Sequence, residues 1–319
     1  MTELQLKLLE YIRKGETTEK VCSDLKISEK QLYYYLSLLK NLGVLYEVEY
    51  GCDGKRFLNF ANGSLITNMC PQLTINNDNL KVIKTLAISD LHLGDYQSCF
   101  SKLDALFDYA VRNGIHIILI FGDVLNGEYS KNCEFLNNDE QVKYFIENFP
   151  YDKSINTIGI IGNHEKDSFI NQNHIDPTCS INLKRPDVHF VNRVFANLQI
   201  KDRQSKTNIS TNIRMSHSSG SSGDNVQIHI QGHHHRYSVF DCDDSKLTIH
   251  VPAFYSSSIT SCNARVLKYP EFLEIDFYIN RRDMSIPKLD INHFAFISND
   301  KTPNELSNLS YAVRTKKKN

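Results

Sequence analysis

Side chains that can bind metal ions recur along the chain wherever a short apolar run ends. Five such ends carry only aspartate, asparagine and histidine, at Asp90, His92, Asp123, Asn163, His164, His217, His233 and His235. Aspartate and histidine are ordinary ligands for zinc, manganese or iron, a carboxylate can bridge two ions, and an asparagine carbonyl is a neutral oxygen ligand. Ligands bind at the carboxyl ends of strands in open α/β sheets. The pattern therefore predicts a site for divalent metal ions.

Three consecutive histidines, His233 to His235, stand in the stretch QGHHHRY, far from either end of the chain. An expression tag would sit at a terminus, so the triplet belongs to the protein itself. If the backbone is near-extended there, alternate side chains share a side. On that hypothesis His233 and His235 face the metals and His234 points away, which reduces three apparent ligands to two.

The elements that must position these residues begin at residue 84. TLAISD, IHIILIFGD and INTIGIIGN predict buried strands, and CFSKLDALFDYAVRNG predicts a helix between the first two. This βαβ start implies parallel strands covered by helices. After residue 186 the chain changes to consecutive strands with turn signals between some of them, which indicates a β-sandwich.

Residues 1–62 predict a separate unit of three short helices followed by a hairpin, which resembles a winged helix-turn-helix domain. A DNA-binding version should be basic, yet residues 1–60 hold nine positive and nine negative side chains. Two interpretations stay open. The unit contacts phosphates through Lys30, Gln31, Tyr34, Lys40, Lys55 and Arg56, or it packs on the rest of the chain or on a partner protein. We expect a linker over 63–83, a catalytic domain over 84–300 and a solvated tail over 301–319.

The motifs stand in a fixed order, as Asp90-Leu91-His92, Gly122-Asp123, Gly162-Asn163-His164-Glu165, His217 and Gly232-His233-His234-His235. This series resembles the calcineurin-like metallophosphoesterase superfamily, whose motifs D-x-H, G-D, G-N-H-[DE], H and G-H-x-H follow the same order. The resemblance covers roughly residues 84–280. It implies a four-layer α/β/β/α sandwich, and ISDLHLGD and GDVLNG look most like branches that hydrolyse phosphodiesters, including DNA-repair nucleases.

The same resemblance implies two divalent ions, with manganese as the first expectation and iron, zinc or nickel as alternatives. It assigns Asp90, His92 and His235 to one ion, Asn163, His217 and His233 to the other, and Asp123 to both. It assigns catalysis to Asp123, Asn163 and His164. His164 is expected to contact the scissile phosphate and to stabilise or protonate the leaving oxygen, while a hydroxide that bridges the ions attacks phosphorus.

Some of these residues also allow structural interpretations. Asp90 alone could cap a helix, and Asp123 alone could occupy a turn. His174 and His189 compete with His217, but neither sits at a strand end followed by small residues. Asn126 and Glu165, beside the motifs, either support the site or lie at the surface. Arg236 and Tyr237 either reach the substrate or take part in packing.

The whole-chain composition excludes several classes of protein. The chain has 319 residues, is 41% hydrophobic and 23% charged, and carries a net charge of −1, which is ordinary for a soluble globular protein. No apolar run approaches the ~20 residues of a membrane helix, and a secretory signal is not expected. The eight cysteines are scattered, which favours free thiols in a reducing cytoplasm.

Together these features favour a dimetal phosphodiesterase or nuclease that acts on nucleic acid or nucleotide phosphodiester bonds in the cytoplasm. The alternatives are a phosphomonoesterase acting on protein or a small molecule, and a DNA-binding regulator with a non-catalytic metal site. The expected partners are nucleic acid and, through the winged helix, a protein; a membrane is not expected, and the sequence predicts no oligomeric state.

Overall fold

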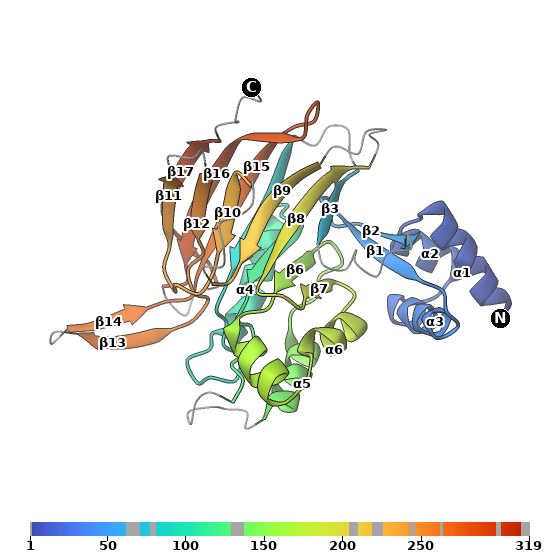
Figure 1. Ribbon diagram of the computed structural model, residues 1–319, viewed down its shortest axis with the longest axis horizontal. Helices are drawn as coiled ribbons and strands as arrows, with labels where there is room; N and C mark the ends of the chain where they lie inside the picture. Colours follow the sequence, from blue (N-terminus) through green and yellow to red (C-terminus); the bar gives the residue numbers. More distant parts are fainter. Residues whose placement is uncertain are drawn as a thin grey trace.

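The structure of the protein is a computed structural model. It describes residues 2–61, 71–76, 81–128, 137–203, 210–218, 226–242, 246–261, 264–297 and 301–313. These residues form two large sheets packed face to face, with helices on one outer face and a helical unit at one end (Figure 1). None of the helices in the described ranges combines the length and the apolar character that a membrane span requires.

A seven-stranded sheet forms the first half of the sandwich. Its order is β17 (Asn304–Ala312), β16 (Ser285–Ala295), β15 (Glu271–Asn280), β4 (Val82–Ile88), β5 (Ile117–Phe121), β6 (Asn156–Ile160) and β7 (Val188–Val191). Strands β4 to β7 are parallel, and the other pairs are antiparallel. The outer face carries α4 (Leu103–Arg112), α5 (Asn138–Asn148) and α6 (Pro177–Lys184). The 3-10 helix η2 (Phe100–Lys102) precedes α4, and the π-helix η3 (Glu165–Gln172) follows β6.

An eight-stranded sheet forms the second half. Its order is β11 (Ser238–Cys242), β12 (Lys246–His250), β10 (Ile228–Gln231), β9 (Ser210–Ser216), β8 (Phe195–Asp202), β3 (Gln72–Ile75), β1 (Tyr46–Gly51) and β2 (Arg56–Phe60). A separate hairpin pairs β13 (Ser257–Ser261) with β14 (Ala264–Lys268). The two-sheet sandwich predicted for this chain is therefore confirmed.

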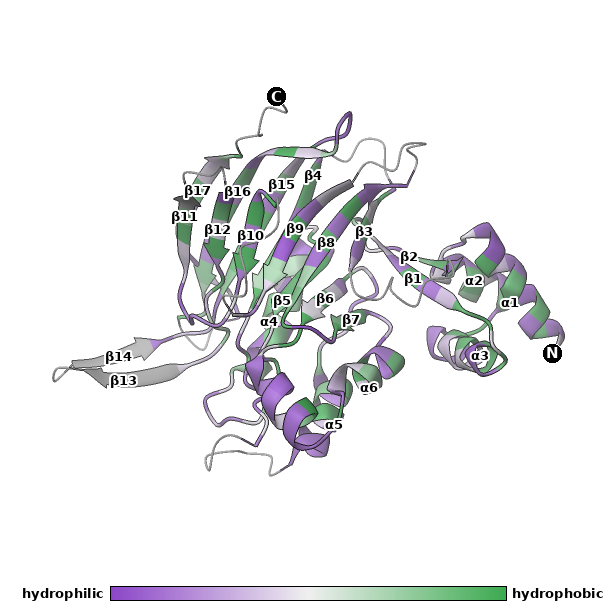
Figure 2. Cartoon of the chain, viewed as in Figure 1, coloured by the Kyte–Doolittle hydropathy of each residue, from purple (hydrophilic) through white to green (hydrophobic). Residues whose placement is uncertain are grey.

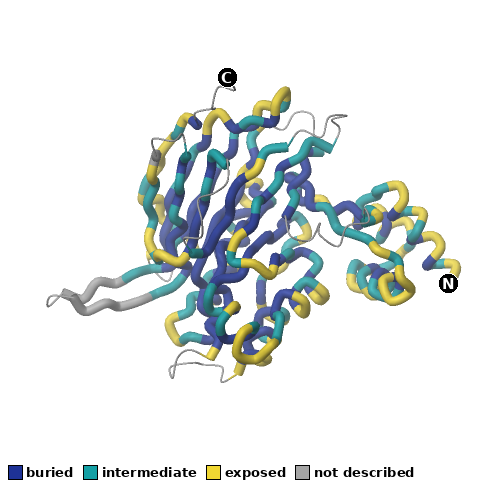
Figure 3. The backbone as a smooth tube through the Cα atoms, in the orientation of Figure 1, coloured by how far each residue is buried: buried dark blue, intermediate teal, exposed yellow. Residues whose placement is uncertain are grey.

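The strands of β4 to β7 are buried on both faces because each face packs on another layer. Ile117, Leu119 and Phe121 of β5 belong to the core between the sheets, whereas Ile118 and Ile120 belong to the core beneath the helices. Figure 2 shows hydrophobic residues recurring along the strands of both sheets, and Figure 3 shows most of these strands buried. Burial on both sides explains why IILIF reads as an unbroken apolar run.

The N-terminal unit consists of α1 (Glu3–Lys14), α2 (Thr18–Leu25) and α3 (Glu29–Asn41), packed on the β1–β2 hairpin. Thr2, Thr17 and Ser28 cap the three helices with their side-chain oxygens. The three helices and the hairpin lie where the sequence predicted them. The hairpin also continues the eight-stranded sheet, because β1 pairs with β3. The winged-helix identity of this unit stays a prediction.

Two predicted boundaries differ from the structure. The expected linker over 63–83 contains β3, which pairs with β1 and β8 inside the large sheet. The expected tail over 301–319 contains β17, which pairs with β16 along nearly its whole length. Strand β17 is an edge strand with mostly exposed side chains, so its sequence lacks the apolar alternation that would have predicted it. Residues 314–319 lie outside the described residues.

A layer of helices outside the eight-stranded sheet was also expected. Within the described ranges, the helices that pack on that sheet are α1 to α3, at the edge formed by β2. The sandwich thus has two sheets and one full helical layer, and the N-terminal unit covers only one edge of the second sheet.

Candidate metal centre

The eight predicted residues meet at one edge of the sandwich. Asp90 and His92 follow β4, Asp123 follows β5, and Asn163 and His164 follow β6. The other sheet supplies three histidines, with His217 after β9 and both His233 and His235 after β10. Parallel strands end at the same edge of a sheet, which explains the convergence within each sheet. Packing of the two sheets then brings the two sets together.

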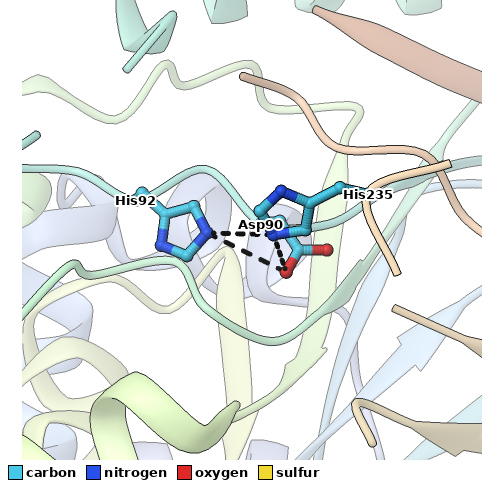
Figure 4. A group of neighbouring side chains, drawn as sticks. All are labelled: Asp90, His92 and His235. Carbon is cyan, nitrogen blue, oxygen red and sulfur yellow. Dashed lines mark hydrogen bonds and ion pairs between the residues drawn. The ribbon is translucent and has the colours of Figure 1, made fainter. Parts of the chain in front are cut away.

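The first group contains Asp90, His92 and His235, whose ligand-type atoms all lie within 4.8 Å of one another (Figure 4). Asp90 Oδ1 lies 3.2 Å from His235 Nε2, and His92 Nε2 lies 3.4 Å from the same nitrogen. Asp90 is fully buried and His92 is 6% exposed. Burial lowers the pKa of His92 to about 4, so its imidazole is neutral.

The second group is built around His217. Its Nε2 lies 3.0 Å from Asp123 Oδ2, 2.9 Å from Asn163 Oδ1 and 3.2 Å from His233 Nδ1. Asp123 also lies within reach of His92 and His164, so it stands between the two groups. The competitors of His217 lie elsewhere, because His174 is exposed and His189 packs against Tyr50.

The chemistry of these atoms fits a divalent cation. The His217 Nδ1–H donates to the carbonyl oxygen of Phe121 at 2.7 Å, which turns Nε2 toward two oxygen acceptors. Burial alone would lower the pKa of His217, but the Asp123 carboxylate raises it to about 9. Burial opposes ionisation of Asp123 too, yet His217 lowers its pKa to about 2. Buried acceptors gathered without enough protons attract a cation.

Two buried atoms support the same conclusion. Asp90 Oδ1 and His92 Nδ1 have no hydrogen bond of good geometry within the described residues. An unsatisfied buried oxygen is costly in free energy unless a ligand or ion contacts it. The donor set of two carboxylates, one amide oxygen and four imidazoles suits borderline divalent ions such as zinc, manganese or iron.

His164 lies beside both groups, and part of its side chain is exposed to solvent. Its backbone N–H donates to Asp123 Oδ1 at 2.9 Å, and its Nδ1–H donates to the carbonyl oxygen of Asn126 at 2.6 Å. The Nε2 atom lies 4.0 Å from Asp123 Oδ2, and 20% of the side chain is exposed. Because Nδ1 is occupied, Nε2 is the atom through which His164 can exchange a proton with a substrate.

Five of the candidate ligand residues have unusual backbone conformations. Asp90, His92, Asp123, His233 and His235 all have positive φ, between 46° and 71°. Left-handed conformation costs a non-glycine residue about 1–3 kcal/mol and concentrates at functional sites. This strain is consistent with a site that tertiary packing holds in place.

The backbone of the histidine triplet is therefore not extended. The prediction that an extended backbone makes alternate side chains point the same way is wrong. His233 has φ 71° and His235 has φ 54°, so two left-handed residues, and no pleat, set the directions of the side chains. His234 still lies apart from the two groups. Its ring packs 4.4 Å from that of His250, and its Nε2 lies 3.2 Å from Gln231 Nε2.

Two glycines allow the motif loops to approach closely. Gly122 has φ +87°, and a Cβ there would lie 2.6 Å from His217 Nδ1. A Cβ on Gly162 would overlap the side chain of Asp123. Among the motif glycines Gly122, Gly162 and Gly232, only Gly122 has positive φ. Gly162 and Gly232 instead provide space for neighbouring atoms.

Glu165 is buried next to the site and holds the motif loops by hydrogen bonds. It is 2% exposed and accepts hydrogen bonds from the backbone N–H groups of Asp123 at 3.2 Å, Leu125 at 2.7 Å and Gly162 at 2.8 Å. Burial, with the nearby Asp123, raises the pKa of Glu165 to about 7. The sequence left open whether Glu165 supports the site or lies at the surface. In the structure it is the buried hydrogen-bond acceptor that connects two motif loops.

The other residues left open have different surroundings. Asn126 is 3% exposed and offers its carbonyl oxygen to His164. Tyr237 packs with its ring centroid 4.6 Å from that of His293, away from the two groups, and Arg236 is exposed.

Sequence reasoning missed Tyr255, whose ring contacts His92 and His235. Its surroundings, VPAFYS, contain no polar motif that could have identified it.

Comparison with known proteins gives one family and several similar structures. The calcineurin-like phosphoesterase family matches residues 83–241. Vacuolar protein sorting 29 from Cryptosporidium parvum is similar with a TM-score of 0.39 and 16% identity, over 72% of this chain and 97% of that one. The nuclease MPE from Pseudomonas putida has a TM-score of 0.31 and 15% identity, over 58% and 87%. The calcineurin-like phosphoesterase YfkN from Bacillus subtilis has a TM-score of 0.32 and 10% identity, over 72% and 90%. No curated protein matches the chain.

Proposed function

We propose that this protein, whose residues 83–241 match the calcineurin-like phosphoesterase family, is a metal-dependent hydrolase of phosphodiester bonds in nucleic acids. The observation that carries the reaction class is the pair of ligand groups with Asp123 between them and His164 beside them. Such a pair suits two divalent ions, for which manganese is our first choice.

Each predicted ligand has a place in this proposal. Asp90, His92 and His235 would hold one ion, and Asn163, His217 and His233 would hold the other. Asp123 would contact both. When bound, such ions polarise a phosphoryl oxygen and lower the pKa of a coordinated water.

His164 supplies the proton in the proposed reaction. Its Nδ1–H is fixed on Asn126, so the open Nε2 can carry a proton to the leaving oxygen. The backbone N–H of His164 also binds Asp123, which keeps the imidazole aligned with the groups.

The openness of the site supports a polymeric substrate. His233 is exposed, and 36% of the His235 side chain is exposed. The large cavity of about 880 Å³ lies elsewhere, between α3, β1 and α6. A phosphate within a long chain can reach an open edge of the sandwich, whereas a deep pocket would favour a small monoester.

The N-terminal unit offers a second contact for nucleic acid. On α3, Lys30 and Lys40 are exposed and Tyr34 is 60% exposed. Lysines bind phosphates and an exposed aromatic ring can stack on a base. The even balance of charge in this unit limits its electrostatic contribution, so we propose that it guides the substrate and that the metal centre provides the specificity for phosphodiesters.

An activity panel tests the proposal. The protein is stripped of metal, supplied with Mn²⁺, and incubated with single- and double-stranded DNA and RNA, bis-(p-nitrophenyl) phosphate and p-nitrophenyl phosphate. We expect cleavage of nucleic acid and preference for the bis ester, with loss of at least 100-fold in Asp123→Ala and His164→Ala. His174→Ala, at an exposed histidine outside the groups, is the matched control.

Each other result has a definite meaning. Preference for the mono ester would replace the proposal with a phosphomonoesterase. Tight DNA binding without turnover, in protein that binds metal, would indicate a regulator with a non-catalytic site.

A further inference from the structure

Tyr255 lies beside the first metal group, on the segment that follows β12. Its ring centroid lies 5.4 Å from that of His92, at an interplanar angle of 75°, and 6.2 Å from that of His235, at 60°. Both contacts are edge-to-face, the arrangement that aromatic rings prefer. Tyr255 thus contacts two of the three side chains in this group.

The orientation of His92 is not fixed by a hydrogen bond from Nδ1, unlike that of two neighbouring histidines. His217 and His164 each donate Nδ1–H to a backbone carbonyl oxygen, at 2.7 Å and 2.6 Å. The Nδ1 atom of His92 is buried, and in the part of the chain that the structure describes it has no hydrogen-bond partner. Metal-binding histidines are normally oriented by a hydrogen bond from the second ring nitrogen. For His92, packing against neighbouring rings takes the place of that hydrogen bond, and among the rings of His164, His235 and Tyr255 only that of Tyr255 belongs to neither the predicted ligands nor the predicted catalytic residues.

The position of Tyr255 is itself fixed. Its hydroxyl lies 2.8 Å from Gln97 Oε1 and 3.3 Å from Asp95 Oδ1. The next residue, Ser256, donates its backbone N–H to the carbonyl oxygen of Gln97 at 3.1 Å. The loop after β4 therefore holds both the hydroxyl and the backbone, and the ring is presented to the imidazoles as a rigid surface.

We propose that Tyr255 is a positioning residue that orients His92 and His235 for the first metal ion, by ring packing in place of a hydrogen bond. The inference rests on the proposed metal-dependent function and concerns one of its two ions. Tyr255 lies outside the segment 83–241 that matches the family, so the motif series does not predict this role.

Metal titration tests the inference. Mn²⁺ binding to the full chain, stripped with chelator, is measured by isothermal titration calorimetry for the wild type, Tyr255→Leu and Tyr255→Phe. We expect two ions in the wild type and about tenfold weaker binding of one ion in Tyr255→Leu, with the other unchanged. Tyr255→Phe keeps the ring and should stay within about twofold of the wild type. Tyr96→Leu is the matched control, because Tyr96 is 70% exposed on the loop after β4 and lies between Asp95 and Gln97, which contact the Tyr255 hydroxyl.

The possible results separate this inference from the proposed function. The inference is refuted if Tyr255→Leu binds both ions like the wild type, or if Tyr255→Phe binds metal as weakly as Tyr255→Leu. Either result would show that ring packing does not orient the ligands, and it would leave the proposed function unaffected. If the wild type binds no Mn²⁺ and hydrolyses no phosphoester, the proposed function fails with it. Thermal melts verify that each variant folds, and Tyr255→Met replaces Tyr255→Leu if the latter unfolds.

Discussion

His217 Nε2 lies 3.0 Å from Asp123 Oδ2, although β9 and β5, which precede the two residues, belong to different sheets. The contact is buried, with His217 at 0% and Asp123 at 2% exposure. It joins the two sheets at the metal centre, so the site depends on how the sheets pack and cannot be formed by either sheet alone.

The first prediction concerns the pH dependence of the metal-free protein. The folded pKa of His217 is raised to about 9 and that of Asp123 is lowered to about 2. The contribution of His217 to stability is therefore full below pH ~6.5 and is lost as the pH rises toward 9, while that of Asp123 is present above pH ~3.8 and is lost as the pH falls toward 2. Urea unfolding in chelator should show stability falling between pH 6.5 and 9.

His217→Gln should flatten that fall, because glutamine does not titrate. Bound divalent metal should remove it in the wild type as well, since the metal replaces the proton on Nε2. An equally steep fall in His217→Gln would assign the effect to other groups.

The second prediction separates the three histidines of the triplet. His234→Ala should retain metal and at least half of the activity, because its ring packs on His250 outside the groups. His233→Ala and His235→Ala should each lose at least tenfold in metal affinity, since each removes a ligand. Metal content after dialysis, measured by inductively coupled plasma spectrometry, gives the comparison. Equal loss in all three would show that His234 also acts at the site.

The third prediction concerns Glu165. Glu165→Ala removes the acceptor of three buried backbone N–H groups, so we expect a loss of about 3 kcal/mol in the free energy of unfolding. The loops that carry Asp123 and Asn163 should loosen, and metal affinity should fall with stability. Urea unfolding measures the first effect, with Glu128→Ala, at an exposed side chain, as the control. A change below about 0.5 kcal/mol would contradict this role.

The fourth prediction compares two glycines. Gly122 and Gly43 have φ of +87° and +84°, but only Gly122 has neighbours within 4 Å of an added Cβ, the nearest being His217 Nδ1 at 2.6 Å. Gly43→Ala should cost about 1 kcal/mol of stability and leave metal binding unchanged. Gly122→Ala should also displace His217 and weaken metal binding at least tenfold. Calorimetric titration with Mn²⁺ distinguishes the two, and equal affinities would show that the loop accommodates the methyl group.

The fifth prediction concerns the attachment of the N-terminal unit. Arg56 is 3% exposed and donates to Glu29 Oε1 at 2.6 Å, Asn156 Oδ1 at 2.7 Å and the carbonyl oxygen of Ile155 at 3.1 Å. Arg56→Met leaves these acceptors without a donor, so we expect a loss of about 3 kcal/mol in the free energy of unfolding. Lys55→Met, at a side chain that is 51% exposed, should change it little. If proteolysis between residues 1–60 and the sandwich is faster in Arg56→Met and unchanged in Lys55→Met, the lost stability lies in the attachment of the N-terminal unit.

The sequence did not predict two strands, β3 inside the eight-stranded sheet and β17 at the edge of the seven-stranded sheet. Strand β3 has four residues, too few for the alternation of Leu73 and Ile75 to mark a strand, and β17 is mostly exposed and lacks apolar alternation. Their pairing depends on partners far along the chain, because β3 joins β8 and β17 joins β16. Local sequence does not encode such partners, and only the assembled sheet satisfies the hydrogen bonds of these strands.

The amino-acid sequence by itself determined the identities of the candidate ligands and the strand ends that carry them. Apolar runs report burial directly, and the carboxyl ends of parallel strands must meet at one edge. Tertiary structure alone decided three further features. It set the left-handed backbone of His233 and His235, the approach of His217 to Asp123 across the two sheets, and the packing of Tyr255 against His92. All three depend on contacts between segments distant in sequence, whose positions follow from the packing of whole sheets and from no local pattern.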